Sequence, residues 1–130
     1  QVYAVNEGNA QKWPAGTRKF LDYLKGKDKP TGRPYAARYS GCLVADVHRV
    51  LLGGGLYLYP AETDKPEGKL RLLYEANPLA MVVEQAGGKA SNGMQRILDV
   101  EPKSLHQRVP LIIGSRDDVT LAEDFILGVR

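Results

Sequence analysis

Apolar residues recur at the spacing of a helix face in two parts of the chain. They are Phe20, Leu21 and Leu24 in the first part, and Leu43, Val44, Val47, Val50 and Leu51 in the second. Apolar residues three or four positions apart predict amphipathic helices, here over residues 15–24 and from Leu43 to the glycines at 53–55. Pro78 suits the first turn of a third helix that Gly87 and Gly88 close, and residues 117–127 predict a fourth.

Short apolar runs between these helices predict strands. Leu56 to Tyr59 consists of residues that favour strands and is stopped by Pro60, and Val109 to Gly114 is a second run of this kind. Weaker patterns predict strands over residues 2–5 and 89–91, whereas residues 26–34 and 61–68 have the composition of loops. Because strands and helices alternate, we expect an α/β layered fold in one domain that covers residues 1–130.

The composition supports a single globular domain. Apolar residues make up 43% and charged residues 25% of the chain, which disfavours a disordered or fibrous protein. The longest apolar runs, such as Val109 to Ile113, are too short to cross a bilayer, so we expect no membrane partner. We expect no signal peptide before the first predicted strand, and the start at Gln1 without methionine suggests a piece of a longer protein.

Cysteine usage and charge narrow the functional classes. Cys42 is the one cysteine, which fits a reducing compartment and a cytoplasmic protein, and its apolar surroundings predict a buried side chain. The net charge is +3, and the basic residues are scattered along the chain instead of clustered. That pattern disfavours a nucleic-acid surface and is explained equally well by a few Lys and Arg around a phosphorylated small molecule.

The densest group of polar residues lies between Gly68 and Pro78. Lys69 and Arg71 are two positions apart, so both point to one face of an extended segment and would suit a phosphate, although a solvated edge explains them equally well. Glu75 precedes the third predicted helix. A carboxylate there could cap the helix or bind a hard divalent cation, and capping is the simpler interpretation.

The histidines and the remaining glycines point to no chemistry. His48 and His106 share no metal-ligand spacing with each other or with Cys42, so structural hydrogen bonding is the simpler role for both. The glycines at 53–55 follow a helix and precede a strand, which is the reverse of the order in a phosphate-binding loop. The chain also lacks the serine motif of the α/β-hydrolases.

Several motifs, in the same order along the chain, resemble those of class I fructose-1,6-bisphosphatases. They are Asn6-Glu7-Gly8, Ala37-Arg38-Tyr39-Ser40-Gly41, Val44-Ala45-Asp46-Val47-His48-Arg49, Leu58-Tyr59-Pro60-Ala61, the segment GKLRLLYEANPLA from Gly68 to Ala80, and His106-Gln107-Arg108. The resemblance runs from about Tyr3 to Val119, and the segment from Gly68 is its most specific part. It implies the C-terminal half of the sugar phosphatase fold, with a mixed, roughly five-stranded sheet flanked by helices.

The resemblance also implies which residues bind the substrate, fructose 1,6-bisphosphate. The 6-phosphate or the sugar nearby should be contacted by Asn6, Tyr39, Tyr59 and Lys69. Arg38 is expected to reach the 6-phosphate of a neighbouring subunit in a homotetramer. Asn9 stands where many relatives have a phosphate-binding tyrosine, and because its amide reaches less far it is not counted among the contacts.

At the reacting end of the substrate, the resemblance places Arg71 near the 1-phosphate and the metal ions. It makes Glu75 a ligand of Mg²⁺, or of Mn²⁺ or Zn²⁺, in place of a cap. The implied reaction is hydrolysis of the 1-phosphate in gluconeogenesis, by a metal-activated water. In this family an N-terminal region supplies most metal-binding carboxylates and the effector site. Nothing in these residues resembles that region, so we expect this chain to be inactive alone.

Other functions would use much of the same sequence. Sedoheptulose-1,7-bisphosphatase, or an enzyme that acts on both sugars, would need the same binding residues. A non-catalytic module that binds sugar phosphates is a second alternative, but such a module would have no use for a metal carboxylate at Glu75. A nucleic-acid binder would need aromatic residues interleaved with a basic stripe, which the sequence lacks.

Overall fold

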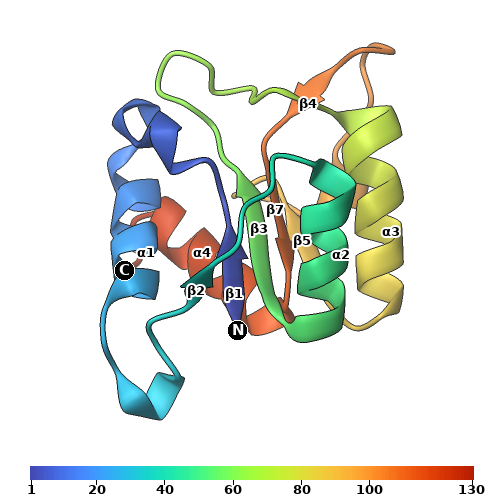
Figure 1. The fold of residues 1–130 in the computed structure, drawn as a ribbon. Helices are drawn as coiled ribbons and strands as arrows, with labels where there is room; N and C mark the ends of the chain where they lie inside the picture. The colour runs from blue at the N-terminus through green and yellow to red at the C-terminus, as the bar shows by residue number, and fades with distance from the viewer.

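A five-stranded sheet lies at the centre of the computed structural model, which describes all residues from Gln1 to Arg130 (Figure 1). The strands are ordered β2 (Ala36–Ala37), β1 (Val2–Ala4), β3 (Gly55–Tyr59), β7 (Leu111–Gly114) and β5 (Lys89–Ser91). Strands β2, β1 and β3 run parallel to one another, whereas β7 is antiparallel to both β3 and β5. The predicted α/β fold with a mixed, five-stranded sheet is therefore confirmed.

Helices cover both faces of this sheet (Figure 1). On one face lie α1 (Ala15–Lys25) and α4 (Arg116–Ile126), and on the other lie α2 (Leu43–Gly53) and α3 (Asn77–Gln85). All four helices were predicted, and each begins and ends within about one residue of the positions expected from capping and breaking residues. None of them is long and apolar enough to span a membrane.

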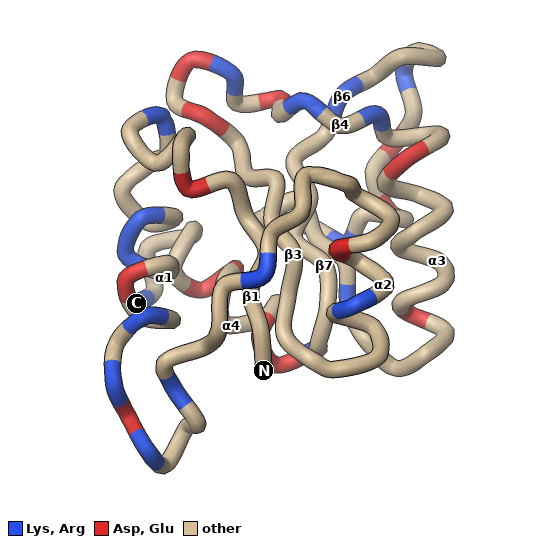
Figure 2. The backbone as a smooth tube through the Cα atoms, in the orientation of Figure 1, with Lys and Arg blue, Asp and Glu red and all other residues tan.

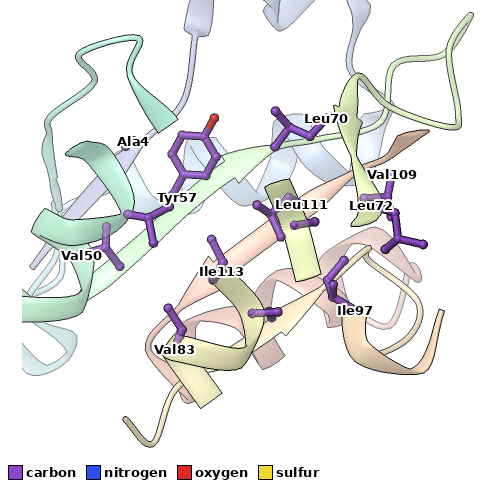
Figure 3. Packing of buried hydrophobic residues seen from close by; sticks show 14 residues of the cluster. Ala4, Val50, Tyr57, Leu70, Leu72, Val83, Ile97, Val109, Leu111 and Ile113 are labelled. Carbon is purple, nitrogen blue, oxygen red and sulfur yellow. The ribbon is translucent and has the colours of Figure 1, made fainter. Parts of the chain in front are cut away.

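The central strands are apolar along their whole length because they contribute to a core on each side. Successive strand residues point to opposite faces, so Leu56 and Leu58 pack under α1 and α4, while Tyr57 between them packs under α2 and α3. Figure 3 shows this second core, where Tyr57 and Ile113 from the sheet lie beside Val50 from α2. The result is a three-layer sandwich with two separate apolar cores.

Glycines permit the close approach of α2, β1 and β3. Gly54 has φ 83°, a conformation that glycine adopts readily, and its N–H closes the end of α2 by donating to Val50 O at 2.8 Å. A Cβ added to Gly55 would lie 1.8 Å from the backbone oxygen of Val2 on β1. The glycines after α2 thus end the helix, as predicted, and they also let β3 pair closely with β1.

Proline divides the strand that was expected over residues 109–114. Pro110 has no N–H to donate, and the backbone changes partners there. Residues Arg108–Val109 form β6, which pairs with β4 (Leu70–Arg71) in a separate two-stranded sheet, while β7 begins only at Leu111. The single predicted strand is therefore wrong, and the break carries β4 and β6 to the edge of the molecule above the central sheet (Figure 1).

One strand was not predicted, and one prediction is wrong. No element was assigned to Ala36 and Ala37, which form β2, a two-residue strand that is too short and too exposed to leave an apolar signal. Cys42 was expected to be buried, but it is exposed because it precedes the first turn of α2 and lies off the apolar stripe of that helix.

Asp118 in the first turn of α4 is one of the few buried charged side chains. The Tyr35 hydroxyl donates to Asp118 Oδ1 at 2.6 Å, which ties the loop before β2 to α4, while the buried Oδ2 has no partner. Burial raises the pKa of Asp118 above its usual value, and the Tyr35 hydrogen bond opposes the shift only in part. The folded state therefore binds this proton more tightly than the unfolded state, so stability falls as the pH rises through this pKa.

Replacing Asp118 with asparagine is expected to raise the melting temperature of the chain at pH 7 by a few degrees, because an amide is cheaper to bury than a carboxylate. The gain should disappear below about pH 3, where the carboxyl is protonated in both the folded and the unfolded state. Thermal melts between pH 3 and pH 7 measure the effect, with Asp64→Asn, an exposed carboxylate that does not contribute to this pKa shift, as the control. A lower melting temperature at pH 7 would show that the bond to Tyr35 outweighs the burial cost.

Candidate functional site

Three predicted binding residues meet at one edge of the central sheet. Asn6 follows β1, Tyr39 follows β2, and Tyr59 is the last residue of β3. Because these three strands are parallel, their carboxyl ends lie at the same edge. Ligands of open α/β sheets bind outside the carboxyl ends of the strands, so this edge is the place where the topology favours a site.

A solvent-open cleft of about 260 Å³ occupies this edge. Its lining residues come from the ends of the parallel strands and the segments that follow them: Val5, Asn6, Asn9, Trp13, Tyr39, Tyr57, Leu58, Tyr59, Pro60 and Glu62. The lining combines apolar and aromatic side chains with a few polar ones, a composition typical of small-molecule sites.

The turn Asn6-Glu7-Gly8 has a structural explanation. Asn6 begins a 3-10 helix (Glu7–Lys12), and its Oδ1 accepts from the Gly8 N–H at 3.0 Å. Glu7 accepts from the Tyr3 hydroxyl at 3.1 Å and from Lys25 Nζ at 2.9 Å, so it joins β1 to α1. Because Asn6 Oδ1 already accepts the Gly8 N–H, the NH₂ of the side-chain amide remains as a donor for a ligand in the cleft.

Three tyrosines supply the aromatic and hydroxyl surface of the cleft. Burial raises the pKa of the Tyr57 phenol, and the nearby Tyr39, Tyr59, Asp46 and Glu75 add to the shift. Burial likewise raises the pKa of Tyr39, although the residue is still 45% exposed. The hydroxyls of Tyr39 and Tyr57 therefore stay protonated at neutral pH and can donate hydrogen bonds to an anion.

Lys69 lies beside the cleft, next to Glu62, which lines it. Its Nζ lies 4.0 Å from Glu62 Oε1, and Glu62 is 5% exposed whereas the Lys69 side chain is 33% exposed. The loop is folded back at this point because Glu62 and Lys65 exchange backbone hydrogen bonds of 3.1 and 3.0 Å. A buried carboxylate thus holds a partly exposed ammonium group beside the cleft, where it can bind a more highly charged anion.

Arg71 and Glu75 lie where the small sheet passes into α3. The Arg71 N–H donates to Glu75 Oε1 at 2.8 Å, which is the kind of bond expected of a helix cap. Oε2 makes no hydrogen bond or ion pair, and the side chain is partly buried. The Arg71 guanidinium pairs with no carboxylate, and its buried Nε has no partner. Glu75 can therefore cap with one oxygen while the other is available to a cation.

Arg38 lies outside the cleft. Its backbone N–H donates to Tyr3 O at 2.9 Å across the sheet edge, and its exposed guanidinium donates to Ala37 O at 2.8 Å. Figure 2 shows Lys and Arg positions at β4 and β6. Arg71 is the last residue of β4, Arg108 is the first residue of β6, and Lys69 directly precedes β4. The structure thus brings Asn6, Tyr39 and Tyr59 together, places Lys69 beside them, and leaves Arg38 on the outer surface.

The histidines take no part in the cleft. His106 Nδ1 and the Tyr74 hydroxyl are 2.8 Å apart, which agrees with the structural hydrogen bonding expected of His106. His48 is exposed and makes no hydrogen bond, so the same expectation is wrong for His48. No three Asp, Glu, His or Cys side chains gather closely enough to hold a metal ion on their own.

Two polar residues of the cleft, Asn9 and Glu62, were not among the predicted binding residues. Asn9 was left out because an amide is shorter than a tyrosine, yet it lines the cleft directly. Glu62 was read as part of a polar loop, although it is buried beneath Lys69. The position of Asn9 was indicated by the resemblance, but the position of Glu62 carries no local signal, because Glu62 becomes part of the site only through the folding of distant segments.

The comparisons with known proteins agree with one another. The family model described as the C-terminal domain of fructose-1,6-bisphosphatase matches residues 1–126. Class 1 fructose-1,6-bisphosphatases from Chlorobaculum tepidum and Chlorobium phaeovibrioides are 60% and 57% identical over all 130 residues. The chain spans 39% of the length of each of these relatives. The crystal structure of Leishmania major fructose-1,6-bisphosphatase in apo form is similar over 95% of this chain and 39% of its own, with a TM-score of 0.89 and 50% identity.

Proposed function

The chain belongs to the fructose-1,6-bisphosphatase family through its match to the C-terminal domain, and we propose that it is the substrate-binding part of such an enzyme. The complete protein would hydrolyse the 1-phosphate of fructose 1,6-bisphosphate to give fructose 6-phosphate and phosphate. The observation that supports this most is the cleft at the carboxyl ends of three parallel strands, where Asn6, Tyr39 and Tyr59 converge beside Lys69.

In this proposal the cleft binds the 6-phosphate end of the substrate. A phosphate needs several donors that converge from different directions. The Asn6 amide, the phenols of Tyr39 and Tyr59, and the Lys69 ammonium provide them from four separate segments of the chain. Holding the distant phosphate fixes the position of the sugar, so the binding free energy orients the 1-phosphate for reaction.

The 1-phosphate would lie toward Arg71 and Glu75. Arg71 offers a guanidinium that no carboxylate neutralises, which suits an anion with developing charge. Glu75 fits a divalent cation such as Mg²⁺ because it is a hard oxygen donor whose Oε2 is not used within the chain. When bound, the cation would neutralise charge on the phosphate and activate a water for attack. The other carboxylates of that site would come from the part of the protein outside these 130 residues.

Arg38 is the residue through which we propose that neighbouring subunits share a binding site. Its side chain lies on the outer edge of the sheet beside the two-residue β2, and not in the cleft of its own chain. A guanidinium in that position could reach the 6-phosphate in an adjacent subunit. The proposed assembly is therefore an oligomer, specifically a homotetramer, in which neighbouring sites share this arginine.

Replacing Lys69 with alanine in the full-length protein tests the phosphate assignment. We expect the KM for fructose 1,6-bisphosphate to rise roughly 10- to 150-fold, which corresponds to the loss of a hydrogen bond with a charged group worth roughly 1.5 to 3 kcal/mol. Some loss of turnover is expected as well, because remote binding also positions the reacting phosphate.

Steady-state kinetics at saturating magnesium measure this change. Lys65→Ala is the matched control, since Lys65 is an exposed lysine on the same loop, and it should leave KM unchanged. An unaltered KM in Lys69→Ala, in protein that still melts cooperatively, would remove Lys69 from the binding site.

A further inference from the structure

The loop that presents Tyr39 to the cleft is held by a buried carboxylate. Asp46, four residues into α2, accepts from the backbone N–H of Ser40 with both oxygens, at 3.0 Å to Oδ1 and 3.2 Å to Oδ2. A second bond, from the Cys42 N–H to Ser40 Oγ at 3.1 Å, tightens the same turn. The peptide that joins Tyr39 to Ser40 is thus fixed from the side of α2.

This carboxylate is buried at a cost to stability. Asp46 is 1% exposed, and its only charged partner is Arg49, whose side chain is 46% exposed and lies 3.7 Å from Oδ1. A buried charge with one exposed, distant partner contributes little to stability, and a neutral side chain of the same size would be cheaper to bury. The first turn of α2 favours a negative charge, and the bonds from the Ser40 N–H offset part of the burial cost, but an asparagine could accept the same N–H with one oxygen. Stability alone therefore does not single out a carboxylate at this position.

The location of Asp46 relative to the cleft explains why a carboxylate stands there. The hydrogen-bonded N–H belongs to the residue directly after Tyr39, so it sets the direction in which the Tyr39 side chain leaves the backbone. Tyr39 makes no side-chain hydrogen bond of its own and is 45% exposed, so little else fixes it.

We propose that Asp46 is a positioning residue for phosphate binding: its buried carboxylate fixes the Tyr39–Ser40 peptide and so aims the Tyr39 hydroxyl into the cleft. The inference rests on the proposed function, because it assumes that Tyr39 contacts the substrate phosphate. It extends that function to a residue that touches no ligand.

Two other roles of the Asp46 carboxylate predict different results. A purely electrostatic carboxylate near an anion would weaken binding, so its removal would tighten it. A purely structural carboxylate would change stability and leave KM unchanged.

The test is Asp46→Asn in the full-length protein, assayed with fructose 1,6-bisphosphate. Asparagine keeps the shape and one acceptor oxygen but cannot accept the N–H with two oxygens. We expect KM to rise about 10-fold, in the range for one weakened hydrogen bond to a charged group, while turnover changes little. Asp118→Asn, a buried acid in α4 that lies outside the cleft, is the matched control and should leave KM unchanged.

A double-mutant cycle with Tyr39→Phe separates positioning from general damage. If Asp46 acts through the Tyr39 hydroxyl, Asp46→Asn should raise KM less than about 2-fold further once that hydroxyl is gone, because effects in one network are not additive. A full 10-fold increase in the Tyr39→Phe background, or a lower KM in Asp46→Asn, would overturn the proposal.

The Tyr39→Phe variant alone distinguishes a failure of the role proposed for Asp46 from a failure of the binding role proposed for Tyr39. If it raises KM while Asp46→Asn does not, the role of Asp46 is wrong and the binding role of Tyr39 stands. If Tyr39→Phe leaves KM unchanged, the binding role of Tyr39 fails, and the proposal for Asp46 fails with it. Should Asp46→Asn not fold, Asp46→Thr provides an uncharged acceptor that buries more easily, and the same increase in KM is expected.

Discussion

The full-length protein with Glu75→Gln should turn over fructose 1,6-bisphosphate at least about 100-fold more slowly and need much more magnesium. Residues that only support metal ligands already cost roughly 10- to 100-fold when changed, so a direct ligand should cost at least as much. The amide has nearly the same shape and still accepts the Arg71 N–H through its oxygen, so the cap bond of 2.8 Å is retained. What is lost is a negative charge facing divalent cations.

Magnesium titrations of activity measure the turnover and the magnesium requirement of Glu75→Gln, and thermal melts of the same preparation measure its stability. The melting temperature should change little, which separates a lost ligand from lost packing. Glu67→Gln, an exposed carboxylate on the preceding loop, is the control and should behave as the parent protein does. Normal turnover of Glu75→Gln at low magnesium would leave Glu75 as a helix cap and nothing more.

Negligible phosphatase activity is expected of the 130-residue chain assayed alone, against roughly 1 to 1,000 turnovers per second for ordinary enzymes. Phosphoryl transfer by metal-activated water requires ions held by several carboxylates, and no three metal-binding side chains gather in this chain. The proposed substrate-binding cleft is present, but the reacting phosphate would have too little positive charge around it.

The assay uses fructose 1,6-bisphosphate with saturating magnesium, and a cooperative thermal melt confirms that the tested chain is folded. Magnesium-dependent turnover in the ordinary range would mean that the metal site is complete without the rest of the protein. The proposed division of labour between this chain and the remainder would then be wrong.

Sequence reasoning reached the fold through its strongest local signals. The stripe of Phe20, Leu21 and Leu24 and the apolar run at Leu56 to Tyr59 are long enough to define an element without knowledge of its neighbours. Local signals failed where tertiary contacts determine which residues form a strand. Pro110 divides an apolar run between two sheets, and β2 exists only because β1 offers it an edge.

The site was predicted less from spacing than from resemblance. Local patterns left Lys69, Arg71 and Glu75 each with a plain structural alternative, and for Glu75 the structure shows the cap bond itself. Asp46 did leave a signal that was not used: a carboxylate beside Val47 and one turn before Val50 lies on the buried face of α2. Charge on an apolar stripe indicates a buried polar contact, and here that contact is the loop of Tyr39.

The order of strands in the sheet also has a consequence for the newly made chain. Every residue that lines the cleft lies between Val5 and Glu62, so a ribosome makes all of them in the first half of the domain. Yet β7, made near the end, lies between β3 and β5 and covers the open side of β3. Until residues 111–114 emerge, β3 is an unpaired edge and the strand ends that frame the cleft lack their support. The last strand of these 130 residues therefore completes a cleft to which it contributes no side chain.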